Sequence, residues 1–245
     1  MSTALIELKE TSFSAQNEII VENISLSFEE GTTTALVGPS GGGKSTVLKL
    51  AAGLMLPTEN DAYFRGQGIS SMNRAQTLAF RKEAAFVFQD SALWANQNLR
   101  QILELPLMIH YPKMTHSQRT ARIVEVLAEI GYKKHLDIRP SLLSMGEQKL
   151  IAFARALVCS PKILFLDEWT ESLDDSAEDR LVNIVKRMNK SGATIIFISH
   201  DFKVIKELAQ RICMIVDGHL ALTATAEEFS QNESLAKMIE KGIAL

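Results

Sequence analysis

The residues best suited to carry chemistry form a glycine-rich run that fits the pattern G-x-x-x-x-G-K-[ST]. The run follows an apolar stretch and leads into a helical pattern, which is the context that this motif needs. Its glycines let backbone N–H groups curl around phosphate oxygens, a task that an ordinary glycine-rich turn would not perform. The lysine would reach the β- and γ-phosphates and the next hydroxyl would hold Mg²⁺. The run comprises Gly38, Pro39, Ser40, Gly41, Gly42, Gly43, Lys44, Ser45 and Thr46.

A second candidate lies where the apolar run Ile163–Leu166 ends in two adjacent carboxylates, Asp167 and Glu168. Asp167 suits the outer shell of a magnesium ion, and Glu168 is placed to act as a general base on water. Taken alone, two solvated acids at a strand end would be the commoner explanation. A phosphate-binding loop on the same chain favours the catalytic interpretation.

Several strands and helices must position these residues. Short apolar runs alternate with helical patterns, which indicates an α/β fold. Residues 4–30 instead alternate apolar and polar positions, which predicts antiparallel strands with one solvent-exposed face. Residues 90–141 read as a helical insertion between core strands. The expected core strands are Thr34–Val37, Ala85–Phe88, Ile163–Leu166, Thr194–Ile198 and Ile212–Val216.

Further motifs stand in a fixed order around the two candidates. Gln89 ends a strand, His200 follows another, and residues 143–149 and 171–174 flank the acidic strand end. In order and spacing this set resembles the glutamine loop, switch histidine, signature segment and D-loop of ATP-binding cassette (ABC) transporter ATPases. The resemblance covers essentially the whole chain.

The resemblance implies a P-loop NTPase core with a parallel sheet, an N-terminal antiparallel β subdomain and a helical insertion subdomain. The corresponding limits are about 1–30 for the antiparallel edge and about 31–90 with 159–220 for the nucleotide-binding core. The helical subdomain with the signature would span about 91–158, and a C-terminal extension about 221–245. The ligands implied are ATP and Mg²⁺.

The resemblance also assigns roles to individual residues. A second anion site, at the start of a helix, would lie at Ser144, Gly146 and Glu147 and would serve the ATP of a partner cassette, most simply an identical chain. Gln89 would coordinate Mg²⁺ or the lytic water. His200 would contact the γ-phosphate and help to orient Glu168. Without the other motifs, Gln89 and His200 would read as a surface amide and a structural histidine.

The sequence departs from the family pattern at several positions. Met145 replaces a glycine, Glu147 a glutamine and Trp169 a proline, and we expect Trp169 to pack beneath its loop or to touch a partner. Family members stack adenine on an aromatic residue where this chain has Ala15. Phe13 lies two positions earlier on the same strand face and is either the substitute or a core residue.

Bulk composition narrows the class of transporter or switch. A net charge of −3 gives no basic footprint for nucleic acid, and no apolar run approaches the length of a bilayer span. We therefore expect a cytoplasmic subunit held at the inner face of the membrane by separate permease subunits, which would contact Leu93 and Trp94. Residues 92–107 resemble those of Mce/Mla-type lipid-transport ATPases. The alternative is a non-transport ABC ATPase that acts on DNA or the ribosome.

Overall fold

The computed structural model describes residues 4–232, and its strands form two sheets. The larger sheet has six strands in the order β10-β9-β3-β8-β7-β6, and the smaller has four in the order β2-β1-β4-β5. The larger sheet contains β3 (Thr33–Val37), β6 (Ala84–Val87), β7 (Ile163–Asp167), β8 (Thr194–Ile198), β9 (Arg211–Val216) and β10 (His219–Thr225). The smaller contains β1 (Ala4–Ala15), β2 (Glu18–Glu29), β4 (Glu59–Phe64) and β5 (Gln67–Gly68).

The larger sheet is parallel except where β10 pairs with β9. All five predicted core strands are present, and β3, β7 and β8 are buried along their whole length. Their alternate residues enter two different core clusters: Leu36 and Phe165 belong to one, and Ala35 and Leu164 to the other. Burial on both faces explains why these strands read as unbroken apolar runs.

The smaller sheet is antiparallel, as the alternation in residues 4–30 predicts. Ile6 and Leu8 on β1 are buried and pack with Val47 and Leu48 of α1 (Lys44–Ala51). The sheet is larger than residues 1–30, because β1 also pairs with β4, whose neighbour is β5. The polar segment that forms β4 carries no clear strand pattern, so its pairing with β1 could not be read from the sequence.

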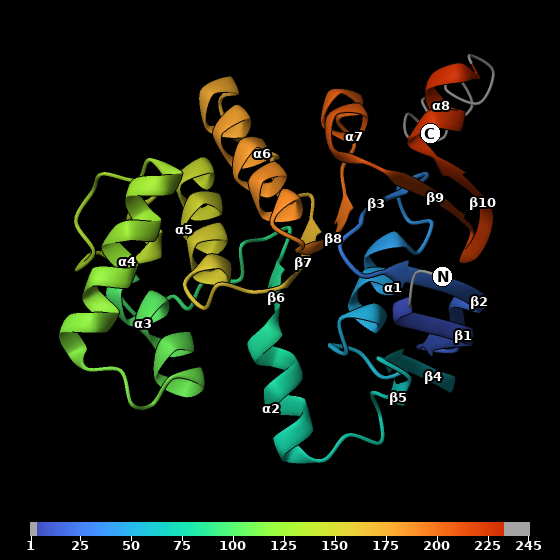
Figure 1. Ribbon diagram of the computed structural model, residues 1–245, viewed down its shortest axis with the longest axis horizontal. Coiled ribbons are helices and arrows are strands. Elements are labelled where there is room, and N and C mark those ends of the chain that lie inside the picture. The colour runs from blue at the N-terminus through green and yellow to red at the C-terminus, as the bar shows by residue number, and fades with distance from the viewer. Residues whose placement is uncertain (1–3, 233–245) are drawn as a thin grey trace.

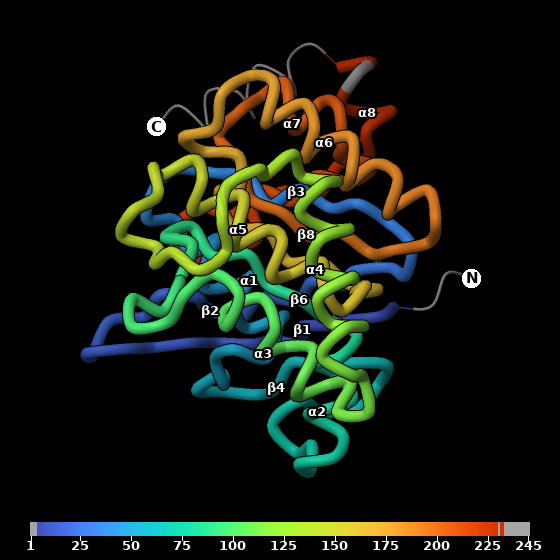
Figure 2. Tube along the Cα trace, turned by 90° about the vertical axis from the view of Figure 1, so that its left-hand side faces the viewer, coloured from blue at the N-terminus to red at the C-terminus, as the bar shows by residue number. Residues whose placement is uncertain are grey.

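Helices cover the larger sheet and form a separate cluster at one side of the molecule (Figure 1). In Figure 2 that cluster, made of α3, α4 and α5, faces the viewer. Asn98, Thr115 and Ser144 begin these helices, each with a capping box in which its side chain and that of the N3 residue satisfy each other's backbone N–H. The remaining bounds are α2 (Arg74–Glu83), α3 (Leu99–His110), α4 (His116–Ile130), the 3₁₀ helix η1 (Pro140–Leu142), α5 (Met145–Leu157), α6 (Asp175–Lys190), α7 (Phe202–Leu208) and α8 (Ala226–Gln231).

The C-terminal extension begins with the short helix α8, which follows β10 directly. The rest of the extension predicted for about 221–245 lies outside the described residues from position 233 onward. Among residues 4–232, no helix is both long enough and apolar enough to span a bilayer.

Candidate functional site

The glycine-rich run forms the turn between β3 and α1, at the carboxyl end of the central strand. Gly38 has φ +138, and a Cβ there would lie 2.0 Å from the carbonyl oxygen of Ile215, so only glycine fits. Lys44 is 6% exposed, and its Nζ donates to the carbonyls of Gly38 at 2.8 Å and Pro39 at 2.7 Å. Burial lowers the pKa of Lys44, while Glu168 and Asp167 act in the opposite direction. The loop thus curls around a buried ammonium group.

A hollow of about 170 Å³ lies at this loop. Ile20 of β2 lines it together with residues 41–46. Ile20 was missed by the sequence reasoning, which placed the adenine contact at Phe13 or Ala15. Phe13 is half-buried against the core beside the smaller sheet, and neither Phe13 nor Ala15 is among the residues that line this hollow.

The structure brings two of the predicted magnesium ligands together. Ser45 lies in the first turn of α1 and Asp167 ends β7, and the Ser45 Oγ donates to the Asp167 Oδ1 at 3.0 Å. Asp167 is 2% exposed, and this burial raises the pKa of its carboxyl against the lowering effect of Ser45 and nearby lysines. A hydroxyl and a carboxylate beside a phosphate loop are the oxygen donors that Mg²⁺ prefers.

Glu168 and His200 meet because β7 and β8 are neighbouring parallel strands that end at the same edge. The His200 Nε2 lies 2.9 Å from the Glu168 Oε1. Burial raises the pKa of Glu168 and the adjacent His200 lowers it, with burial the larger cause. A buried carboxylate with a raised pKa is a better proton acceptor than an exposed one, so the pair is suited to activating water.

Gln89 lies just beyond β6, and its side chain is exposed. Its backbone carbonyl accepts a hydrogen bond from Lys149, a buried residue of α5 that also donates to the Glu168 carbonyl at 2.8 Å. Lys149 falls inside the predicted signature segment, residues 143–149, but sequence reasoning assigned it no role. The available signal was a lysine among the apolar residues that are buried along α5.

The predicted second anion site is the amino end of α5. Ser144 accepts from the Glu147 N–H at 3.2 Å, and the Glu147 carboxylate accepts from the Ser144 N–H at 3.0 Å. Lys134 pairs with Glu147 at 2.5 Å and holds the pKa of that carboxyl below its usual value. The extra negative charge at position 147 is therefore offset within the chain. Met145 is 71% exposed at this end, and a Cβ on Gly146 would lie 2.8 Å from the Ser172 carbonyl oxygen.

Trp169 packs beneath its loop. It is 1% exposed, and its ring stacks on that of Phe153 with centroids 5.5 Å apart. Its Nε1 finds no hydrogen-bond partner within the described part of the chain. The replacement of the family's proline at this position therefore adds an aromatic contact between the catalytic loop and α5.

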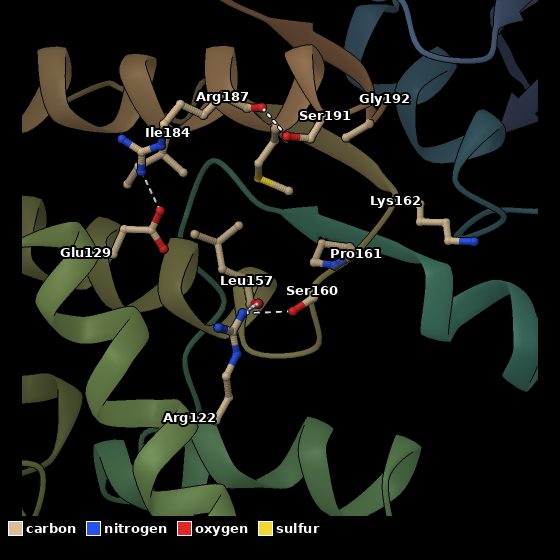
Figure 3. Close-up of a pocket in the computed structure, with 12 residues that line it drawn as sticks. Arg122, Glu129, Leu157, Ser160, Pro161, Lys162, Ile184, Arg187, Ser191 and Gly192 are labelled. Carbon is tan, nitrogen blue, oxygen red and sulfur yellow. Dashed lines mark hydrogen bonds and ion pairs between the residues drawn. The ribbon is translucent and has the colours of Figure 1, made fainter.

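A larger hollow, of about 490 Å³, lies at the opposite, amino ends of β7 and β8. Figure 3 shows Arg122 directed at Ser160, and Arg187 at Glu129. Arg122 also donates to the carbonyls of Leu157 and Val158. Both arginines of this hollow, Arg122 and Arg187, are thus paired within the chain. None of the residues predicted to bind nucleotide lines the hollow.

Comparisons with known proteins agree with this geometry. A family model described as "ABC transporter" matches residues 21–171. The nickel import ATP-binding protein NikE of Shigella flexneri serotype 5b is 33% identical over 233 residues, covering 93% of this chain and 87% of that protein. The protein of the same name in Escherichia coli K12 is 35% identical over 217 residues, covering 87% of this chain and 81% of that protein.

Solved structures show the same likeness. The dimeric ATP-binding cassette MJ0796, in a post-hydrolysis state with ADP and Pi, matches with a TM-score of 0.83 at 29% identity, over 90% of this chain and 98% of that chain. A structure of the ATP binding subunit of an ABC transporter also has a TM-score of 0.83, over 98% of this chain and all of that chain. At 20% identity, this second likeness concerns the fold alone.

Proposed function

The chain belongs to the ABC transporter family and is an ABC-type ATPase, and from this premise we propose that it powers an importer through separate membrane subunits. The observation that carries the ATP hydrolysis on which this proposal rests is the meeting of three elements at one sheet edge. These are the loop around Lys44, the hydroxyl–carboxylate pair of Ser45 and Asp167, and the Glu168–His200 pair.

In the proposed reaction, Lys44 and the backbone N–H groups of its loop bind the triphosphate of ATP. Ser45 and Asp167 would hold Mg²⁺, which would supply neutralisation of phosphate charge, and Gln89 would be a further ligand or would orient the water. Glu168 accepts the proton of the attacking water. His200, at 2.9 Å, fixes the carboxylate and faces the γ-phosphate.

The proposed working form is a homodimer. The amino end of α5 presents free backbone N–H groups at an exposed surface, with Ser144 and Met145 both exposed. This end points its positive dipole outward, so it would bind the γ-phosphate of an ATP held by the loop of a second copy. The related cassette MJ0796, which is dimeric, supports this arrangement.

The proposed permease contact is a hollow of about 480 Å³ that is lined by residues of α2, β6, α3 and α5, among others. Four large apolar side chains that line it are exposed: Leu54 by 36%, Leu78 by 45%, Trp94 by 44% and Ile109 by 49%. Exposed apolar residues gathered around one hollow are typical of protein contact sites. Leu93, the other predicted contact, packs instead against the core.

The direction and substrate of transport rest on the relatives. NikE proteins, which are named for nickel import, support an importer. The phospholipid substrate expected from residues 92–107 gains no support from these relatives. The residues of the described site are all predicted to bind ATP, magnesium or the attacking water, so we propose that the membrane and substrate-binding subunits select the solute. Nothing in the structure specifically favours action on DNA or the ribosome.

Co-purification tests the proposal. From detergent-solubilised membranes, the full chain should carry an integral membrane protein, and Trp94→Lys should lose it while ATP affinity is unchanged. A charged side chain cannot be buried against an apolar partner without a large desolvation cost. DNA or RNA in place of the membrane protein would contradict the transport assignment.

A further inference from the structure

Lys149 connects parts of the site that lie far apart in the sequence. It is on α5 and is 4% exposed. Its Nζ donates to the backbone carbonyl of Gln89 and, at 2.8 Å, to that of Glu168. One ammonium group thus bonds to the backbone of two predicted site residues. Gln89 is the predicted ligand of magnesium or water, and Glu168 is the predicted general base.

The surroundings of Lys149 are unusual for a helix interior. The other buried residues of α5 are apolar: Ile151, Ala152, Phe153, Ala154, Ala156 and Leu157. Burial of an ammonium group is costly unless it is paired and hydrogen-bonded. Burial lowers the pKa of Lys149, while Glu171, Asp167, Glu168 and Asp90 act in the opposite direction. An apolar side chain would serve packing equally well, so packing does not explain the lysine.

The bond from Lys149 to the Glu168 carbonyl holds a residue whose backbone is strained. Glu168 has φ +44, a left-handed conformation that is strained for a residue with a side chain. Its N–H donates to Ile198 at 3.2 Å and its carboxylate contacts His200, so the carbonyl bond to Lys149 is a further anchor. Together these contacts fix the direction in which the carboxylate points.

The segment after Gln89 is held by the same helix. Ser91 and Ala92 have φ +63 and +44, and their carbonyls accept from Arg155 of α5 at 3.1 and 2.6 Å. The Arg155 guanidinium also lies 5.7 Å from the ring centre of Trp94, which lines the proposed permease contact. Lys149 and Arg155 of α5 therefore hold the chain segment that runs from Gln89 to Trp94.

We propose that Lys149 is a positioning residue that sets Gln89 and Glu168 relative to each other and to the signature helix. ATP hydrolysis depends on it, and ATP binding does not. The inference rests on the proposed roles of Gln89 and Glu168. Because α5 begins at Ser144, a shift of this helix moves the second anion site, Gln89 and the carbonyl of Glu168 together.

Two substitutions in the full chain test this assignment. Lys149→Met keeps an unbranched side chain, one heavy atom shorter than lysine, and removes both hydrogen bonds. Lys149→Gln has a side chain of the same length as methionine and keeps two N–H donors on a neutral group. Lys186→Met serves as the control, because Lys186 makes a surface ion pair with Glu207, remote from the site. The measurements are kcat for ATP, the dissociation constant of ATP, and the melting temperature.

Lys149→Met should lower kcat by about 10- to 100-fold, because small displacements of catalytic groups have effects of this size. Its dissociation constant for ATP should stay within about threefold of the parent, the pattern of a lost transition-state interaction. Lys149→Gln should retain more turnover than Lys149→Met but less than the parent, because its side chain is neutral and shorter than that of lysine. Lys186→Met should match the parent. If Lys149→Met does not fold, Lys149→Gln alone decides: lower kcat at unchanged ATP affinity supports the proposal.

Three results would overturn the inference. These are parental turnover in a folded Lys149→Met protein, a parallel fall of kcat and ATP affinity, or a Lys149→Gln protein that is no more active than Lys149→Met. If Lys149→Gln has to decide alone, parental turnover or a parallel loss of ATP affinity overturns it. Failure of the proposed role of Glu168 is a separate observation, since Glu168→Gln would then hydrolyse ATP at the parental rate. Failure of the transport assignment is seen in co-purification and leaves the ATPase measurements unchanged.

Discussion

The glycine-rich loop and the amino end of α5 are both predicted to bind an anion through backbone N–H groups, yet they are constructed differently. The loop depends on backbone geometry: Gly38 approaches Ile215 too closely for any side chain, and Gly43 has φ +97. The amino end of α5 depends on side-chain pairs, with Glu147 held by Ser144 and Lys134. Backbone requirements allow few residue types, whereas side-chain pairs can be exchanged as units. This explains why the glycine-rich loop keeps the family pattern throughout, whereas Met145 and Glu147 depart from it at the amino end of α5.

Replacing Glu168, the predicted general base, should have the largest effect. It changes the catalytic step and leaves both predicted anion sites intact. Glu168→Gln should lower kcat by about 10²- to 10⁴-fold, the usual contribution of a general base. ATP affinity should be retained, because Lys44 and its loop are unchanged. Phosphate release and calorimetric ATP binding measure the two quantities. A Glu168→Gln protein that hydrolyses ATP at the parental rate would remove Glu168 from the mechanism.

The second largest effect is expected from a change in the glycine-rich loop alone. Lys44→Ala should weaken ATP binding by about 10- to 100-fold, the value of one to two charge-assisted hydrogen bonds to phosphate. Calorimetry of ATP binding measures this change. Lys162→Met, at the far hollow, is the matched control and should bind ATP as the parent does. Unchanged ATP affinity in Lys44→Ala would contradict the phosphate-loop assignment.

The α5 side should show a smaller effect that depends on which bond is lost. Glu147→Ala removes the half of the capping box in which the Glu147 carboxylate accepts from the Ser144 N–H, together with the pair with Lys134, and should cost about 1 kcal/mol of unfolding free energy. Glu147→Gln keeps the cap and should cost less, since exposed ion pairs contribute little. Urea unfolding of both variants measures the difference. Equal losses would show that the cap is not what stabilises this end.

The smallest effect is expected for Ile20, which lines the hollow at the glycine-rich loop. Ile20→Ala should weaken ATP binding by about two- to fivefold, as expected for the loss of a partly buried apolar contact. Phe13→Leu should change it less, because Phe13 packs toward the core and Ile20 lines the hollow. A larger loss from Phe13→Leu would return the adenine contact to Phe13.

The contrast between the two sides also explains what could be predicted from the sequence. The core strands and the loop were readable because burial on both faces and positive φ values restrict residue choice locally. Strand β4 was not readable, since its polar residues are held by pairing with β1, which is distant in the sequence.

Side-chain contacts were harder to predict than backbone ones. The link from Lys149 to Gln89 joins positions 60 residues apart, and no local pattern encodes it. Ile20 reaches the loop only because β2 lies beside it, with the Ile20 carbonyl 2.9 Å from where a Gly43 Cβ would stand. Such contacts depend on how the sheets pack, which the sequence does not state locally.

The central claim is that the two anion sites of one chain belong to different ATP molecules in a dimer. The direct measurement is the mass in solution of Glu168→Gln, by light scattering, with and without Mg-ATP. We expect 27.1 kDa without nucleotide, a doubled mass with it, and no doubling when Met145→Glu places a negative charge at the exposed end of α5. A Glu168→Gln protein that binds ATP and keeps the mass of a single chain would contradict the account.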